Sequence, residues 1–175
     1  MPLRHHDAAV GDLFATLKRL GLDEKTLVVF ISDNGPFLSY GEHAGSALPL
    51  REGKLTTYEG GMRTPFLARW PGRVPAGRVS EEPLSTLDLN VTLGNLAGAR
   101  SAAGKSDGTD VSALLLGRPG ARGREEFWFY SGDELHAVRL GDWKLHVPHD
   151  YLRVAAEPGR GGKPSNWANM KPDSI

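Results

Sequence analysis

Apolar residues recur at helical spacing near the start of the chain. The positions that would share one helix face are Val10, Leu13, Phe14, Leu17 and Leu20. This spacing predicts an amphipathic helix that stops at the glycine in position 21. Residues 26–31 (TLVVFI) are continuously apolar and rich in β-branched side chains. Such a run predicts a strand buried on both faces, in a parallel sheet with helices on either side.

Weaker patterns follow along the chain. Residues 66–70 (FLARW) predict a short strand, and residues 85–97 predict a second helix with Ser85 and Asp88 as its capping pair. Three more short strands, joined by turns into an antiparallel meander, are predicted at residues 127–130, 136–140 and 144–147. Residues 35–58 have no clear period and indicate a long functional loop. Beyond residue 148 the chain is rich in glycine and proline and predicts no regular element.

These patterns together favour the α/β class, because a helix is followed by a buried strand. Residues 99–124 are dense in glycine, serine, proline and arginine, which indicates a boundary between two parts. We expect residues 1–120 to belong to an α/β domain. Residues 121–175 would form a small, incomplete antiparallel subdomain.

Composition narrows the class of protein. The chain has 175 residues, with 39% hydrophobic and 24% charged, which is typical of a globular protein. Lysine plus arginine and aspartate plus glutamate each number 21, so no net field favours nucleic acid or an anionic membrane. No apolar run is long enough to span a bilayer. Cysteine is absent, which excludes disulfides, zinc–thiolate sites and thiol-derived nucleophiles within these residues.

Candidate chemistry begins directly after the apolar strand, at Ser32-Asp33-Asn34-Gly35. Ligands of open α/β sheets bind beyond the carboxyl ends of the strands. Asp33 and Asn34 offer oxygen ligands of the kind that Ca²⁺ and Mg²⁺ prefer. The alternative interpretation is an ordinary turn, because Asp-Asn-Gly is common in loops without a metal.

A second candidate segment is GKLTTYEGGMRTP, at residues 53–65. Lys54 lies between small residues and could bring a positive charge to an anionic substrate. The alternative is a solvated surface lysine. Glu59 and Arg63, four residues apart, could be an ion pair that only fixes the loop.

The chain resembles the sulfatases, and the arylsulfatase A-like group most closely. The resemblance is carried by SDNGP (32–36), PLREGKLTTYEGGMRTP (49–65) and RWPGRVPAG (69–77). Two further segments are similar to the family: residues 85–99 to one of its helices, and residues 136–151 to strands of its C-terminal subdomain. The resemblance implies part of an alkaline-phosphatase-like mixed sheet with flanking helices, plus a small C-terminal antiparallel sheet.

The family implies a mechanism and a set of site residues. A cysteine in a Cys-x-Pro-Ser-Arg motif becomes formylglycine, whose hydrate attacks the sulfate sulfur, and a divalent cation, usually Ca²⁺ with Mg²⁺ as the alternative, polarises the sulfate. Asp33 and Asn34 match two of the four usual metal ligands. Lys54 matches the lysine that contacts the sulfate and the leaving oxygen. The resemblance also implies a sulfated small molecule or glycan as substrate, and export to the periplasm or the exterior.

The formylglycine motif, the family's N-terminal aspartate pair and its lysine–histidine motif have no match in this chain. We expect them upstream of Met1, so the chain is interpreted as a C-terminal fragment that would be inactive alone. We also expect Cys-x-Pro-Ser-Arg in the upstream reading frame, which sequencing that DNA tests.

The histidines are secondary candidates. His43 lies on the loop between the metal pair and Lys54 and could line a substrate pocket. His146 and His149 follow the last predicted strand and could do the same, because similar sulfatases shape the pocket with C-terminal loops. Trp128 and Trp143 alternate with polar positions and favour core packing over a sugar platform.

Two other functions remain open. One is a phosphoester or phosphonoester hydrolase of the same superfamily, which shares the metal-bearing core. The other is a catalytically inactive remnant that binds anions or packs on a partner. In that case the strand at residues 26–31 would lack neighbours and expose apolar surface.

Overall fold

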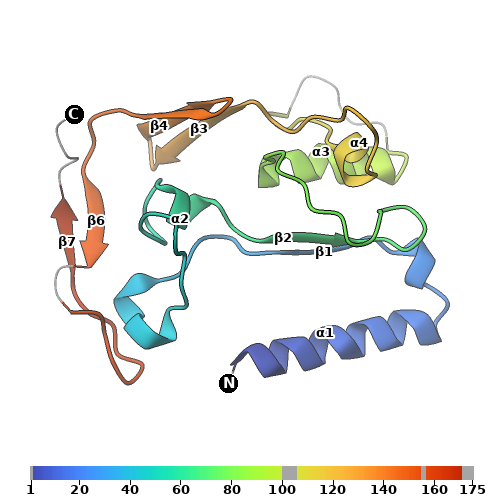
Figure 1. Cartoon of the computed structure of the whole chain (residues 1–175), viewed down its shortest axis with the longest axis horizontal. Helices are drawn as coiled ribbons and strands as arrows, with labels where there is room; N and C mark the ends of the chain where they lie inside the picture. Colours follow the sequence, from blue (N-terminus) through green and yellow to red (C-terminus); the bar gives the residue numbers. More distant parts are fainter. Residues whose placement is uncertain (1, 100–105, 155–156, 171–175) are drawn as a thin grey trace. The chain divides into compact units, whose positions relative to one another are not determined.

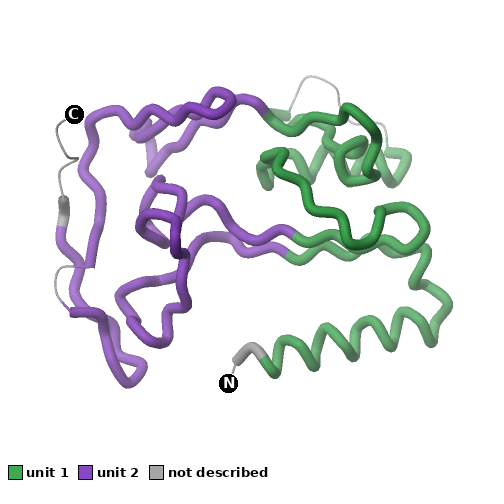
Figure 2. The backbone as a smooth tube through the Cα atoms, viewed as in Figure 1, with its two compact units in different colours: residues 1–30, 67–124 green, residues 31–66, 125–175 purple. Residues whose placement is uncertain are grey.

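A computed structural model describes residues 2–99, 106–154 and 157–170. Contacts divide the chain into two compact units (Figure 2). Unit 1 comprises residues 1–30 and 67–124, and unit 2 comprises residues 31–66 and 125–175. The chain therefore passes from unit 1 to unit 2 after residue 30, returns to unit 1 at residue 67, and enters unit 2 again at residue 125.

Unit 1 begins with helix α1 (Pro2–Arg19), drawn in dark blue in Figure 1. The predicted helix is confirmed, and it starts earlier than its apolar stripe. Gly21 adopts the left-handed conformation, with φ of 65°, which ends the helix. The 3₁₀ turn η1 (Asp23–Lys25) follows. Asp23 accepts two hydrogen bonds from the guanidinium of Arg69, at 2.7 and 2.9 Å, and so ties this turn to the second strand.

Helix α3 (Thr86–Leu96) confirms the second predicted helix and its cap. The Ser85 side chain accepts a hydrogen bond from the N–H of Leu87, while the Asp88 carboxylate accepts one from the N–H of Ser85. The capping box is therefore formed with aspartate in the position where glutamate is more usual. Gly98 follows the helix with φ of 74°.

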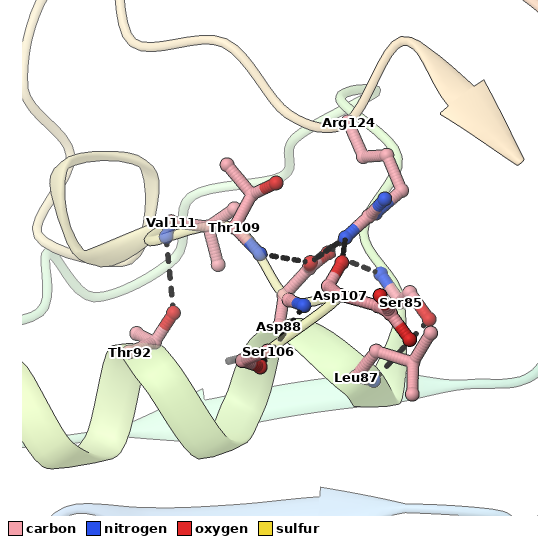
Figure 3. Close-up of polar contacts among 10 residues, drawn as sticks. Ser85, Leu87, Asp88, Thr92, Ser106, Asp107, Thr109, Val111 and Arg124 are labelled. Atoms are coloured by element: carbon pink, nitrogen blue, oxygen red, sulfur yellow. Dashed lines mark hydrogen bonds and ion pairs between the residues drawn. The ribbon is translucent and has the colours of Figure 1, made fainter. Parts of the chain in front are cut away.

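The Asp88 carboxylate is fully buried and joins three segments of unit 1 (Figure 3). Besides Ser85, it accepts hydrogen bonds from the N–H of Thr109, at 2.8 Å, and from the guanidinium of Arg124. Burial raises the pKa of Asp88, but the Arg124 guanidinium and the two backbone donors outweigh it and hold that pKa below its usual value. The carboxylate thus stays charged and fixes the loop after α3.

A short helix, α4 (Ser112–Leu115), lies within the segment that the sequence indicated only as a boundary. Val111, Leu114 and Leu115 are buried there and form the small apolar core of unit 1. The N–H of Val111 donates to the hydroxyl of Thr92, which attaches α4 to α3.

Strands β1 (Val28–Ile31) and β2 (Phe66–Arg69) pair in a two-stranded sheet. Both strands were predicted, but the predicted burial of the first on both faces is wrong for the described residues. Phe30 is 49% exposed and Leu67 is 62% exposed. The reason is that β1 has only β2 as a neighbour here, so its apolar faces are not covered.

Unit 2 contains the predicted antiparallel meander, formed by β3 (Glu126–Ser131), β4 (Glu134–Leu140) and β5 (Trp143–His146). A bulge at Phe129/Tyr130 shifts the register of the first pair. Two further strands, β6 (Tyr151–Val154) and β7 (Trp167–Met170), pair antiparallel and lie side by side in Figure 1. The expectation of no regular element beyond residue 148 is therefore wrong.

The expected core role of two tryptophans is also wrong. Trp128 is 55% exposed and Trp143 is 84% exposed, because both lie on the outward face of the meander. Among the described residues of unit 2, the buried apolar side chains are instead those of Tyr58, Ala137 and Tyr151. No helix among the described residues is long and apolar enough to cross a membrane.

Candidate functional site

The Asp33–Asn34 pair follows β1 directly, as the sequence predicted. Asp33 is exposed and Asn34 is half-buried. The hydroxyl of Ser32 donates to the backbone carbonyl of Asn34, at 2.9 Å, which fixes the turn without using either candidate ligand side chain. This hydrogen bond leaves the Asp33 carboxylate and the Asn34 amide oxygen available for a cation.

Gly35 attaches this turn to the glycine pair of the second motif. Its N–H donates to the carbonyl of Gly61, at 2.9 Å. A Cβ at position 35 would fall far inside van der Waals contact with the carbonyl oxygen of Gly60. Only glycine allows this approach, which is the physical reason for Gly35 after the Asp33–Asn34 pair. Gly60 and Gly61 are required for a different reason, because a Cβ on either would overlap carbonyl oxygens of residues 51–56.

Lys54 is attached to the same turn by its own backbone. Its N–H donates to the carbonyl of Pro36, at 3.0 Å. Its ammonium lies over the ring of Phe37, 5.4 Å from the ring centroid. The segments that carry the Asp33–Asn34 pair and Lys54 are therefore joined at two points, Gly35–Gly61 and Pro36–Lys54.

The backbone on either side of Lys54 is strained. Glu52 and Leu55 are the described non-glycine residues with positive φ, at 59° and 76°. The N–H of Gly60 donates to the carbonyl of Arg51, at 2.8 Å, and the Thr56 hydroxyl donates to the carbonyl of Gly53. These bonds close residues 51–61 into a compact loop that holds the unfavourable dihedral angles. Strain of this kind is found mainly where a loop serves a binding or catalytic function.

The short helix α2 (Glu59–Met62) completes the loop and is anchored by β5. The Lys144 ammonium donates to the Thr57 carbonyl, at 2.6 Å, and to the Glu59 carboxylate, at 2.8 Å. Burial lowers the pKa of Lys144, and the Glu59 carboxylate opposes that effect. An ion pair of Glu59 with Arg63 was the alternative that the sequence left open, and the structure gives Glu59 a partner 85 residues away.

His146 and His149 belong to a cluster of stacked rings under Tyr58. The ring centroids of Tyr58 and His146 are 4.5 Å apart, and those of His136 and His149 are 3.9 Å apart. His149 is only 4% exposed. Burial lowers the pKa of His146 to about 4, and the positive charges of Lys144, His149 and Arg51 contribute smaller effects in the same direction.

His43 lies elsewhere, at the end of the 3₁₀ segment η2 (Leu38–His43), where it is exposed and 3.6 Å from the Glu42 carboxylate. The structure therefore does not bring the three candidate histidines together. Their expected contact with substrate stays a prediction.

Several residues that shape the site were not indicated by the sequence. Lys144 is the most informative, because the alternation in β5 places it on the face opposite Trp143 and Leu145. That alternation was a usable signal for an inward-facing lysine. Phe37 and Tyr58 gave no such signal, since both lie in a segment without a period.

The donor chemistry of Asp33 and Asn34 suits a hard cation, but the set is incomplete. Among the described residues, no group of three or more histidine, cysteine, aspartate or glutamate side chains is placed to hold a metal. Ca²⁺ takes six to eight oxygen ligands. The pair therefore fits one side of such a site.

The chain matches the family model described as Sulfatase over residues 3–99. It is 48% identical over 145 residues to arylsulfatase A of Homo sapiens, and 43% identical over 146 residues to N-acetylgalactosamine-6-sulfatase of Canis lupus familiaris. These alignments cover 80% and 82% of the chain but 28% of each relative. The chain thus spans somewhat more than a quarter of the length of these relatives.

Solved structures show the same likeness. The PsFucS1 sulfatase from a Pseudoalteromonas species superposes with a TM-score of 0.79 and 33% identity, over 97% of this chain and 34% of that one. Ps i-CgsB, solved in complex with k-i-k-neocarrahexaose, gives 0.67 and 32%, over 94% of this chain and 34% of that one. The expected alkaline-phosphatase-like fold is confirmed for the part that the chain covers.

Proposed function

Because the chain belongs to the sulfatase family, we propose that it forms one side of the active site of a sulfuric ester hydrolase. The observation that carries the proposal is the double attachment between the two motifs. The Gly35–Gly61 and Lys54–Pro36 hydrogen bonds attach the turn with the potential cation site to the compact loop that carries the lysine. This arrangement suits a substrate with a compact anionic group.

Asp33 and Asn34 would hold Ca²⁺ or Mg²⁺, together with ligands from outside these residues. Such a cation, when bound, neutralises charge on the sulfate and lowers the pKa of the attacking oxygen. The chain has no cysteine, so the formylglycine nucleophile of the family would also come from outside these residues.

Lys54 would contact the sulfate and the ester oxygen that leaves. An ammonium fixed near that oxygen stabilises the negative charge that develops as the S–O bond breaks. Its backbone is held on Pro36, and its ammonium lies over the Phe37 ring, so little reorganisation is needed when substrate binds. The expected loss on removing one such group is about 100- to 1,000-fold in kcat.

The proposed substrate class is a sulfated small molecule or glycan. The relatives include an arylsulfatase A, an N-acetylgalactosamine-6-sulfatase and a steryl-sulfatase. These names span phenols, sugars and sterols, so they support sulfate as the shared group without selecting the alcohol.

A phosphoester or phosphonoester hydrolase is the second candidate. Its supporting observation is the donor set itself, because Asp33, Asn34 and Lys54 suit a phosphoryl group as well as a sulfuryl group. The sequence of residues 53–61 and the sulfatase relatives favour sulfate over phosphate.

The test compares two esters of one phenol. The protein is produced from its reading frame, including any sequence upstream of Met1, together with a formylglycine-generating enzyme. We expect hydrolysis of 4-nitrophenyl sulfate to exceed that of 4-nitrophenyl phosphate by at least about 100-fold in kcat/KM, and K54A to lose most of it. K18A, which removes an exposed lysine of α1, is the matched control. Preference for the phosphate ester, or no hydrolysis of either ester, would contradict the sulfatase assignment.

A further inference from the structure

The ammonium of Lys54 is held by an aromatic ring. It lies 5.4 Å from the centroid of Phe37, within the range of a cation–π interaction. The lysine side chain has four rotatable bonds, so a fixed backbone alone does not fix the charge. The contact with the Phe37 ring restricts where the Lys54 ammonium lies.

The Phe37 ring is itself positioned by a strand far along the chain. It stacks on Trp167 of β7, with ring centroids 5.4 Å apart and an interplanar angle of 21°. Tyr40 packs on the same ring at 5.5 Å in a tilted orientation. Trp167 lies 113 positions beyond Lys54 and outside the stretch that the family model matches, which ends at residue 99.

The β6–β7 connection is attached to the segment that carries Phe37. The carbonyl of Ser39 accepts hydrogen bonds from the N–H groups of Gly159, at 2.9 Å, and Ser165, at 2.8 Å. A side chain at Gly41 would overlap the carbonyl oxygen of Gly159, so the two backbones lie in direct contact. These attachments place β7, and with it Trp167, against Phe37.

We propose that Trp167 is a positioning residue for the sulfate-binding lysine and that it acts through Phe37. Trp167 holds the Phe37 ring, and that ring holds the Lys54 ammonium where it meets the leaving oxygen. The catalytic relevance rests on the proposed sulfatase function, whereas the placement of Lys54 does not. The β6–β7 hairpin thereby fixes the position of the positive charge that Lys54 presents to substrate.

The kinetic test uses aryl sulfates whose phenols differ in pKa. Without its ring support, Lys54 stabilises the leaving oxygen less, so poor leaving groups suffer most. We expect W167L to lower kcat/KM by about 3- to 30-fold on phenols of high pKa and by less on phenols of low pKa. W167F, which keeps a stacking ring, should restore most of the loss. W143L is the matched control, because Trp143 is exposed in the same unit.

A double-mutant cycle separates positioning from general damage to the fold. In a K54A background, W167L should change kcat/KM by less than about 2-fold, because the group that it positions is gone. An equal loss with and without Lys54, or an equal loss across all leaving groups, would overturn the proposal. If K54A is as active as the wild type, the sulfatase proposal fails instead.

A second readout does not depend on activity. Reductive methylation with ¹³C-formaldehyde labels each lysine, and the Lys54 signal is assigned by its loss in K54R. We expect ring current from Phe37 to displace this signal upfield, F37L to return it to the position of exposed lysines, and W167L to return it part of the way. A Lys54 signal that W167L leaves unchanged would overturn the proposal whatever the kinetics show.

Discussion

Close backbone contact at Gly35 is the residue-scale feature on which the site depends. The Asp33–Asn34 turn can reach the Gly60-Gly61 backbone only because position 35 has no side chain. The structure therefore explains a glycine that the sequence indicated only as a turn former. A turn and a tight contact between two motifs both call for glycine, and only the structure separates the two reasons.

Gly35→Ala tests this contact. The added methyl group overlaps the Gly60 carbonyl, so one of the two segments must move. We expect a loss of about 1–3 kcal/mol in the free energy of unfolding, measured by urea denaturation. Gly11→Ala is the control, because nothing lies within 4 Å of a Cβ there, and it should not destabilise. A G35A protein as stable as the wild type would contradict the described contact.

His146 gives the molecule a pH dependence at the same scale. Its pKa is lowered to about 4 in the folded state, against about 6.5 in an unfolded chain. The unfolded state therefore binds more protons between these values, and stability falls as the pH drops from about 6.5 to about 4. Above pH 6.5 this contribution is fully present.

The check is the urea midpoint at pH 7 and at pH 5. His146→Phe keeps a ring beside Tyr58 and removes the titrating group, so the difference between the two midpoints should shrink. His43→Phe, at an exposed position, should leave the difference as in the wild type. An H146F protein with the wild-type pH dependence would show that His146 does not carry it.

At the scale of elements, one buried carboxylate attaches α3 to its surroundings. Asp88 caps the helix, bonds the loop at Thr109 and pairs with Arg124, whose guanidinium lies 2.5 Å from the carboxylate oxygen. Among the described residues of unit 1, few apolar side chains are buried, so this network replaces part of the core. Breaking a buried pair leaves its partner uncompensated.

Asp88→Asn is therefore expected to cost about 3 kcal/mol in the free energy of unfolding. Because the folded-state pKa of Asp88 is lowered, the stability that it contributes is present above about pH 4 and is lost as the pH falls through the folded-state pKa. Asp12→Asn, at an exposed position in α1, is the control. Thermal melting of both variants at pH 7 gives the comparison, and equal melting temperatures would refute the role of the Asp88 network.

Elements with a strong local signal could be predicted from the sequence. The helical spacing before Gly21, the cap at Ser85 and the alternation in the meander were enough for α1, α3 and β3–β5. Strands β6 and β7 were missed because glycine and proline surround short segments whose pairing is not local. The predicted burial of β1 was wrong because burial of a strand depends on neighbouring strands and helices that these residues do not supply.

At the scale of the whole molecule, the site depends on contacts between distant segments, and these could not be predicted. The motif residues Asp33, Asn34 and Lys54 were identifiable from the sequence. The residues that hold them were not: Lys144 meets the loop at Thr57 across 87 positions, and Trp167 meets Phe37 across an even longer interval. A periodic pattern reports on neighbours within one element and carries no information on such pairs.

The predicted division at about residue 120 stays a prediction for the longer protein. Within this chain, residues 31–66 group with residues 125–175. The motif loop and the C-terminal strands therefore form one compact unit, which is why residues of the meander and of the β6–β7 hairpin can hold the candidate site.

The central claim is that Asp33 provides one side of a cation site used for sulfate ester hydrolysis. The most direct test measures 4-nitrophenyl sulfate hydrolysis by the wild type and by D33A as a function of Ca²⁺ concentration, in protein produced from its reading frame with any upstream sequence. We predict that D33A loses activity by on the order of 100-fold at low Ca²⁺ and recovers part of it at high Ca²⁺, because a weakened site still fills. A D33A protein with wild-type activity and the wild-type Ca²⁺ dependence would contradict the claim.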